Sequence, residues 1–235
     1  MDNVLLILTC TINVNYNKIF LHQTNPAERL QCYLKSIINW LEKTNLKICV
    51  VENSGYTFPE LDEYKTKYIN RFEVLTFNEY SLPEHLQDII YNNSKGSSEL
   101  YSIIYTYNNT KFKNDINFVI KITGRYFVPT FEAFLIDIGI KNRCNHVGIH
   151  DDKHMIIGLR QSNNDRCEIL GIHTILFDML FNINLYDSYG DYTGHVETIY
   201  KNRLKLLDQN KVLTCPSFNI EPTQMGGLNS IISEL

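Results

Sequence analysis

The densest group of candidate metal ligands in this sequence is the run His150-Asp151-Asp152-Lys153-His154. Carboxylate oxygens are ligands that hard divalent cations such as Mg²⁺ and Mn²⁺ prefer. Alternate residues of an extended strand share a face, so Asp152 could share a cation with His150 or with His154, while Asp151 would point to the opposite face. Asp151 and Asp152 are therefore the candidate metal ligands, although a polar turn between two short strands explains the same residues more simply.

Polar residues also gather in four segments that end predicted strands or begin a predicted helix. They are residues 9–11, 52–54, 95–98 and 121–125. Ligands of a parallel sheet bind beyond the carboxyl ends of its strands, so a binding site is expected where these segments meet. In the third segment, a lysine and the backbone N–H groups of a helix start could hold a phosphate. A helix start that is merely capped is the alternative there.

Four apolar runs predict the strands that would position those segments, over residues 4–8, 46–51, 72–77 and 118–122. Helices are predicted between them. The sequence Thr24-Asn25-Pro26 offers a capping residue and a first-turn proline, and it opens a helix whose apolar face ends at Trp40 and Leu41. Further helices are expected over residues 60–70 and after Ser94. This alternation predicts an α/β fold in three layers with a mixed, mainly parallel central sheet.

The second half of the chain has less regular patterning. Residues 146–150 and 155–159 are predicted to be short strands, and residues 169–181 and 196–207 helices. His173 would lie on the first of these helices, as a buried histidine with its hydrogen bonds satisfied. The stretch 215–235 is predicted to be partly loop. No repeat or Pro/Gly-rich linker divides the sequence, so residues 1–235 are expected to form one domain.

The composition excludes several broad classes of protein. The chain has 235 residues, with 22 Lys+Arg against 26 Asp+Glu and a formal net charge of -4. A general nucleic-acid binder needs a clustered basic excess, so only a local basic pocket remains open. No apolar stretch is long enough to span a bilayer, and Asp2 lies where a secretory signal would carry positive charge. With six scattered cysteines, free thiols and a cytoplasmic location are expected.

Three segments resemble the GT-A-type nucleotide-sugar glycosyltransferases, in particular the family 2-like branch. LLILTCT (5–11) is similar to that family's first strand and base-binding loop, LKICVVENSG (46–55) to its second strand, and FVIKITGRYFVP (118–129) to its metal-loop strand. The resemblance implies a nucleotide-sugar-binding half over about residues 1–130 and an acceptor-side half over about 131–235. A UDP-sugar is the first candidate donor. The residues that would hold its nucleoside are Thr9, Thr11, Glu52 and Asn53.

One departure from that family lies in the metal loop, which normally carries Asp-x-Asp for Mn²⁺ or Mg²⁺. Residues 121–127 hold no carboxylate, and Lys121 and Arg125 flank Gly124 instead. Fixed cations can neutralise a diphosphate as a metal does, and the arginine fork matches phosphate oxygens. We therefore predict that Lys121 and Arg125, helped by Lys95, hold the diphosphate and reduce or remove the metal requirement. In the alternative interpretation, Lys121 extends its amine to solvent and Arg125 forms a surface ion pair.

The resemblance implies transfer of a hexose from a nucleotide diphosphate to a glycan or another hydroxyl acceptor. An inverting transfer needs a carboxylate that takes the proton of the acceptor hydroxyl. By their order in the chain, Glu168 and Asp165 are the candidates for this base, although the helix dipole also favours acidic residues at a helix start. His195 and Glu197 are a further candidate pair, for binding the acceptor or as late metal ligands.

Two functions of other classes stay open. A sugar nucleotidyltransferase would normally carry a glycine-rich loop after the first strand, and residues 9–15 contain no glycine. A catalytically silent α/β module that binds a nucleotide or a glycan would account for the missing Asp-x-Asp. Hydrolase and dinucleotide-binding chemistry have little support, because the motifs Gly-x-Ser-x-Gly and Gly-x-Gly-x-x-Gly are absent.

Overall fold

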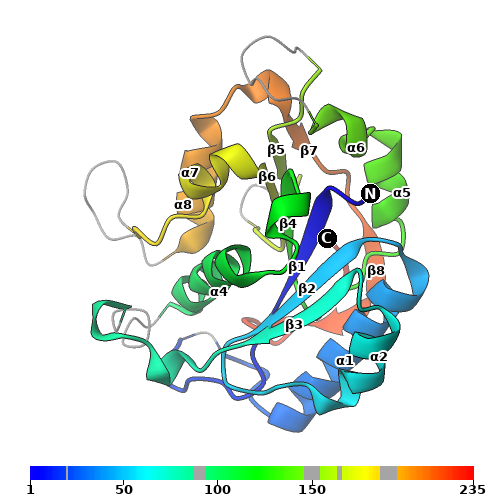
Figure 1. Cartoon of the computed structure of the whole chain (residues 1–235). Helices are drawn as coiled ribbons and strands as arrows, with labels where there is room; N and C mark the ends of the chain where they lie inside the picture. The colour runs from blue at the N-terminus through cyan, green and yellow to red at the C-terminus, as the bar shows by residue number, and fades with distance from the viewer. Residues whose placement is uncertain (20, 87–93, 146–153, 163–165, 186–194) are drawn as a thin grey trace.

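The computed structural model describes residues 1–19, 21–86, 94–145, 154–162, 166–185 and 195–235. A seven-stranded sheet in the order β3-β2-β1-β4-β6-β5-β7 runs through the middle of the molecule (Figure 1). Its strands are β1 (Val4–Cys10), β2 (Lys47–Glu52), β3 (Phe72–Thr76), β4 (Phe118–Thr123), β5 (Gly158–Arg160), β6 (Ile169–His173) and β7 (Val212–Thr214). The α-helices are α1 (Pro26–Lys43), α2 (Asp62–Lys67), α4 (Lys95–Asn109), α5 (Phe131–Asp137), α6 (Ile140–Arg143), α7 (Phe177–Leu180) and α8 (Val196–Lys205). A separate hairpin consists of β8 (Asn219–Gln224) and β9 (Ile231–Glu234).

The central sheet is mixed and mainly parallel. β1 pairs in parallel with β2 on one side and with β4 on the other, and β2 pairs in parallel with β3. Among the described strands of this sheet, β6 alone runs against its neighbours, pairing antiparallel with β4 and with β5. β7 pairs in parallel with β5. The predicted α/β fold with a mixed, mainly parallel sheet is therefore confirmed.

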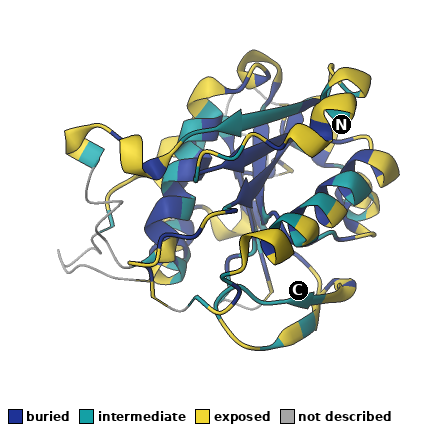
Figure 2. Cartoon of the chain, turned by 90° about the horizontal axis from the view of Figure 1, so that it is seen from below, coloured by how far each residue is buried: buried dark blue, intermediate teal, exposed yellow. Residues whose placement is uncertain are grey.

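Helices cover both faces of the sheet (Figure 1). One apolar cluster contains Trp40 of α1 and Phe131 of α5, and the other contains Ile103 of α4 and Tyr200 of α8. β1 contributes alternate side chains to the two clusters, so every one of its residues is buried. The strands form the buried middle layer, while the helices turn exposed sides outwards (Figure 2). The prediction of three layers from the alternation of strand and helix is confirmed.

Two helices begin at capping side chains that the sequence supplies. Asn25 Oδ1 accepts hydrogen bonds from the backbone N–H groups of Ala27 and Glu28, at 2.9 and 3.3 Å, and α1 starts where it is predicted to start. Ser94 Oγ accepts a hydrogen bond from the Gly96 N–H at 3.2 Å and caps α4. These caps fix where the first turn of each helix lies relative to the strand ends.

The prediction of a helix over residues 169–181 is wrong. Ile169–His173 form strand β6, and only short helical segments follow it, at Thr174–Leu176 and in α7. A short apolar run fits a buried strand and a buried helix equally well, and here pairing with β4 and β5 decides between them. Gly171 permits close packing in that strand, because a Cβ there would lie 2.7 Å from Cε1 of Phe118.

Other predictions for the second half hold in part. β5 covers Gly158–Arg160 rather than residues 155–159, and α8 confirms the helix predicted from residue 196. The strand predicted over residues 146–150 lies outside the described residues. The C-terminal stretch contains loops, as predicted, together with the β8–β9 hairpin. Within the described ranges, no helix combines the length and apolar character needed to cross a bilayer.

His173 is a buried histidine with both ring nitrogens hydrogen-bonded. Its side chain lies at the end of β6, where Nε2 is 3.0 Å from the Cys144 carbonyl oxygen and Nδ1 accepts a hydrogen bond from the Ile175 N–H at 3.3 Å. An accepting Nδ1 carries no proton, so the ring is neutral with its proton on Nε2. Burial lowers the pKa of His173, although the hydrogen bond to the Cys144 carbonyl opposes that change.

Acidification is therefore expected to destabilise the fold through His173. The unfolded chain binds a proton on His173 near pH 6.5, whereas the folded chain binds it only at lower pH. The stability that the neutral ring contributes is therefore complete above pH 6.5 and is lost as the pH falls towards the lowered pKa. The expected loss is up to about 1.4 kcal/mol for each pH unit within that window. Urea unfolding at several pH values should show a flatter profile in His173→Gln than in the unsubstituted chain. The exposed His85→Gln is the control, and equal slopes in all three proteins would contradict the prediction.

Candidate functional site

A cavity of about 860 Å³ lies at the carboxyl ends of β1, β2 and β4. Thr9 and Thr11 line it at the end of β1, Asn53 at the end of β2 and Thr123 at the end of β4. Ligands of parallel sheets bind at this edge. The cavity therefore lies where the polar strand ends of the sequence predict a binding site.

The structure brings together most of the residues that the sequence singles out. The ones that line the cavity are Thr9, Thr11, Asn53, Lys95, Arg125, Glu168, His195 and Glu197. Glu52 and Lys121 are not among its lining residues. Asp151, Asp152 and Asp165 lie outside the described residues.

A chain of polar contacts connects the ends of the first three parallel strands. The Thr11 hydroxyl donates to Asn53 Oδ1 at 2.7 Å, and Asn53 Nδ2 donates to Oε2 of Glu79 at 3.3 Å. Asn15 Nδ2 donates to the other oxygen of the same carboxylate at 3.0 Å. All four side chains line the cavity. They present hydroxyl, amide and carboxylate groups, which suit the hydroxyls of a ribose and the edge of a base.

The Glu52 carboxylate holds the loops around these strand ends. It is fully buried and accepts hydrogen bonds from the backbone N–H groups of Ile12, Ser54 and Tyr56 at 2.8, 2.9 and 2.7 Å, and from the Ser54 hydroxyl. Burial raises the pKa of Glu52, although these hydrogen bonds oppose the rise. Because its contacts are internal, Glu52 positions the loop after β1 instead of lining the cavity.

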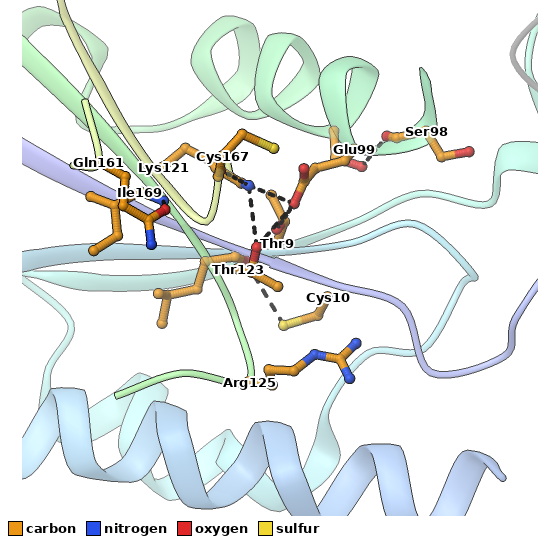
Figure 3. A network of polar contacts seen from close by, with 12 residues as sticks. Thr9, Cys10, Ser98, Glu99, Lys121, Thr123, Arg125, Gln161, Cys167 and Ile169 are labelled. Atoms are coloured by element: carbon orange, nitrogen blue, oxygen red, sulfur yellow. Dashed lines mark hydrogen bonds and ion pairs between the residues drawn. The ribbon is translucent and has the colours of Figure 1, made fainter. Parts of the chain in front are cut away.

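Lys121 is fully buried and forms an ion pair with Glu99 of α4, with Nζ 2.9 Å from Oε1 (Figure 3). The ammonium also donates to the Cys167 carbonyl at 2.7 Å and to the Thr123 hydroxyl at 3.2 Å. Burial alone lowers the pKa of Lys121, but the carboxylate of Glu99 outweighs it and the pKa is raised. An ammonium has three N–H donors, and these three contacts use all of them. The interpretation that Lys121 extends into solvent is wrong.

Arg125 and Arg29 bring two guanidinium groups together at the cavity wall. Both are buried, with 8% and 4% exposure, and both donate to the Tyr33 phenol oxygen, at 3.4 and 2.9 Å. Gln23 accepts from both, through its side-chain oxygen from Arg125 at 2.9 Å and through its carbonyl from Arg29 at 2.8 Å. In the described ranges, no carboxylate lies within 4 Å of either guanidinium. Two buried like charges without a counter-charge favour an anion beside them.

The loop between β8 and β9 packs directly against the Arg125 guanidinium. A Cβ at Gly226 would lie 2.6 Å from its Nη2, so a glycine is needed for this close approach. Arg125 Nη1 donates to the Gln224 carbonyl at 3.4 Å, and the His22 N–H donates to the Gly226 carbonyl at 3.2 Å. The C-terminal hairpin thus holds Arg125 in place. The alternative of a surface ion pair for Arg125 is wrong, because its side chain is buried and pairs with polar oxygens.

The first turns of α4 and α8 meet at the cavity. A Cβ at Gly96 would lie 2.4 Å from Cγ1 of Val196, so the two helix starts approach this closely because residue 96 is glycine. Lys95 is the first residue of α4, His195 directly precedes α8, and Glu197 lies in its first turn. All three line the cavity. Two helix N-termini therefore add positive potential to the same space.

Glu168 lies directly before β6 and beside the end of β4, where the Thr123 N–H donates to its carbonyl oxygen at 3.1 Å. A strand therefore follows Glu168 in place of the predicted helix. Its side chain lines the cavity, and its Oε2 is buried with no hydrogen-bond partner among the described residues. A ligand hydroxyl can supply the missing donor.

Cationic side chains outnumber acidic ones around the cavity, although the whole chain carries a net charge of -4. Seven cations line it, namely Lys18, Arg29, Lys95, Arg125, Arg166, Lys201 and Lys205. The four acidic lining residues are Glu79, Glu99, Glu168 and Glu197. A cavity with this local excess attracts anionic ligands. It is the local basic pocket that the overall composition leaves open.

The loop after β4 does not fit the metal site that the resemblance implies. Thr123, Gly124 and Arg125 occupy it, and none of them carries a carboxylate. Within the part of the chain that the structure describes, no group of three or more His, Cys, Asp and Glu side chains is arranged to hold a metal ion. The other candidate ligands, Asp151 and Asp152, lie outside that part.

Sequence reasoning missed three residues of this site, Arg29, Tyr33 and Glu79. A signal for the first was present, since Arg29 lies one helical turn before Tyr33 on the apolar face of its helix, where a charge is unusual. Glu79 follows the third predicted strand, so the rule that selected the ends of the other strands also selects it.

No protein-family model and no curated protein matches the sequence. Among solved structures, a chain from Desulfovibrio desulfuricans G20, described as a nucleotide-diphospho-sugar transferase, matches with a TM-score of 0.45 and 12% identity, over 92% of this chain and 80% of that chain. A cytidylyltransferase from Leptospira borgpetersenii serovar Hardjo-bovis (strain JB197) matches with a TM-score of 0.46 and 14% identity, over 92% of this chain and 76% of that chain. Both matches are similarities in the path of the backbone.

Proposed function

We propose that the chain transfers a sugar from a nucleotide-diphosphate sugar to a hydroxyl acceptor, with Arg125 and Arg29 holding the diphosphate. The observation that carries this proposal is the pair of buried guanidinium groups at the cavity wall, for which no carboxylate partner is found in the described ranges. A diphosphate supplies the counter-charge and matches the planar donors of arginine.

The nucleoside is assigned to the polar network at the ends of β1, β2 and β3. Thr11, Asn53, Glu79 and Asn15 face the cavity together and carry both donors and acceptors. In this assignment Glu79 contacts the nucleoside, and Glu52 acts indirectly by positioning the loop that carries Thr11.

Lys121 acts indirectly on the diphosphate. Its ammonium neutralises Glu99, an acidic residue that lines the cavity and would otherwise repel phosphate oxygens. The direct cationic contacts come from Arg125 and Arg29, and Lys95 at the start of α4 is close enough to the same cavity to add a further positive charge. With the diphosphate neutralised by fixed groups, donor binding needs no divalent cation.

The group transfer follows from these positions. The acceptor oxygen attacks the anomeric carbon, the bond from that carbon to the diphosphate oxygen breaks, and its electron pair stays on the diphosphate beside the two arginines. Glu168 takes the proton of the acceptor hydroxyl, and its unpartnered Oε2 supports this role. In this proposal His195 and Glu197, which line the same cavity, contact the acceptor. The result is an inverting transfer.

Nucleotide binding tests the donor assignment. Thermal unfolding is followed with UDP, GDP and CDP, with their sugars and with nucleoside triphosphates, each in Mn²⁺, Mg²⁺ or EDTA. One nucleotide diphosphate or its sugar is expected to stabilise the fold by about 2.7 kcal/mol at 100 times its dissociation constant, also in EDTA. Arg125→Gln and Arg29→Gln should each weaken that binding about tenfold or more. Lys141→Gln, which removes a cation away from the cavity, should not.

The same panel separates the rival functions. Binding that requires a metal ion would contradict the role of the arginines, and a response to triphosphates alone would favour a nucleotidyltransferase. Glu168→Gln should bind the nucleotide sugar normally but lose transfer by about 10²-fold or more. A chain that binds nucleotide sugars and never releases the diphosphate with any acceptor would be a silent binding module.

A further inference from the structure

A second group of cations lines the cavity along helix α8. Lys201 and Lys205 follow Glu197 at intervals of four residues, so the three side chains form one stripe along the helix. All three line the cavity, as do the neighbouring Thr198 and Asn202. The cavity therefore has a polar wall, two helical turns long, on which positive charges outnumber negative ones.

The other side of α8 anchors this wall to the protein. Ile199, Tyr200 and Leu204 are 3%, 1% and 2% exposed, and Tyr200 and Leu204 belong to the apolar cluster beneath α4, α7 and α8. Because that face is fixed by packing, the backbone positions of Lys201 and Lys205 are fixed as well, and binding there needs no ordering of a loop.

Arg166 adds a third cation to the wall. It lies shortly before β6 and lines the main cavity, and with Lys201 and Glu197 it also lines a smaller space of about 20 Å³. Buried polar atoms without a described partner border that space, namely Gln161 Nε2 and the Tyr200 hydroxyl. A volume of this size holds a water molecule but no phosphate. An anion would therefore sit in the main cavity and not in this smaller space.

This group is distinct from the pair of arginines that holds the diphosphate. Arg29 and Arg125 are fixed by Tyr33 of α1, on one face of the sheet, whereas α8 covers the other face (Figure 1). Glu168, the proposed base, comes two residues after Arg166 and lines the same cavity. An acceptor whose hydroxyl reaches Glu168 would have the rest of its structure beside Arg166 and Lys201.

We infer that the acceptor carries an anionic group, a phosphate or a carboxylate, which Arg166, Lys201 and Lys205 bind while its hydroxyl approaches Glu168. This inference rests on the proposed function, because it names the class of acceptor for the same cavity. A neutral acceptor would gain nothing from the positive potential that Arg166, Lys201 and Lys205 give to this wall of the cavity. An anionic acceptor pairs with them through charge-assisted hydrogen bonds.

The test uses the full chain saturated with the nucleotide diphosphate that stabilises it most, so that Arg29 and Arg125 are occupied. Inorganic phosphate and acetate are then titrated at constant ionic strength, and thermal unfolding reports their binding. At least one of them should stabilise the complex, and the stronger one tells whether a phosphate or a carboxylate is preferred. In the double variant Lys201→Gln/Lys205→Gln, the apparent dissociation constant of that anion should rise about tenfold or more.

The controls keep the outcomes distinct. The double variant should unfold cooperatively without ligands and bind the nucleotide with unchanged affinity, and Lys141→Gln should behave as the unsubstituted chain. Weakened nucleotide binding in the double variant would overturn the inference, since the lysines would then serve the donor. Equal anion binding in all variants, or none in any, would overturn it too. Failure of every nucleotide to bind contradicts the proposed function instead.

Discussion

Replacing Lys121 by methionine is expected to lower the free energy of unfolding by about 3 kcal/mol. Methionine has a similar length and fits an apolar interior, but it leaves Glu99 without the cation that lies 2.9 Å away. The expected value lies at the low end for a broken buried pair, because the Glu99 side chain keeps 20% exposure and can be partly solvated. Urea unfolding of both proteins measures the difference, with equal slopes showing that the unfolded states are comparable.

A second substitution separates the ion pair from the volume of the side chain. Lys121→Met/Glu99→Gln removes both charges and keeps an acceptor for the Thr9 hydroxyl, which donates to Glu99 Oε1 at 2.8 Å. Most of the lost stability should return in this double variant, since no charge is left without its partner. If the double variant is as unstable as Lys121→Met, the cost comes from packing around residue 121, and the electrostatic explanation is wrong.

Gly124→Ala is expected to destabilise the fold by about 1–3 kcal/mol and to weaken nucleotide binding. A Cβ at this position would lie 2.6 Å from the Cys10 sulfur and 2.7 Å from the Thr9 carbonyl oxygen. The Gly124 N–H donates to that same oxygen at 2.9 Å, so the backbone of β1 cannot retreat without losing the hydrogen bond. Because Arg125 is the next residue, any shift of the backbone also moves the guanidinium.

The control for this variant is Gly158→Ala in β5. A Cβ at Gly158 would approach Cγ2 of Val212 to 3.2 Å, and the other near atoms are also in side chains, which can adjust. This variant should therefore lose less stability and keep nucleotide affinity unchanged. Thermal unfolding with and without the nucleotide measures both effects. If Gly124→Ala and Gly158→Ala lose equal amounts of stability and of nucleotide affinity, the contact with the β1 backbone does not explain the effect of Gly124→Ala.

The sequence predicts the middle of the sheet well and its periphery poorly, for a physical reason. All seven residues of β1 are buried, so the strand is visible as an apolar run. Ile169–His173 form a shorter, mainly apolar run, but a run of five residues fits a strand or a helix, and only pairing across the sheet distinguishes them. Most residues of β8 are exposed or half-buried, and no apolar pattern marks that strand in the sequence.

The position of the site is predictable from strand ends, whereas the partners of its charged residues are not. Lys121 lies within an apolar run, and nothing near it in sequence indicates that Glu99, 22 positions earlier in another element, neutralises it. The same is true of Arg125, whose contacts come from residues 23, 33 and 224. Contacts between residues that are distant in the sequence decide which cation forms an internal ion pair and which one lines the cavity.

The reversed direction of β6 has a consequence for how this architecture can evolve. Since β6 runs antiparallel to β4, its beginning rather than its end reaches the cavity, and the segment that carries Arg166 and Glu168 is the loop before the strand. Insertions or exchanges in that loop would leave the registers of β1, β2 and β4 intact. Descendants of one ancestral chain could thus inherit the ends of β1, β2 and β4 unaltered while the loop before β6, and with it one wall of the cavity, diversifies.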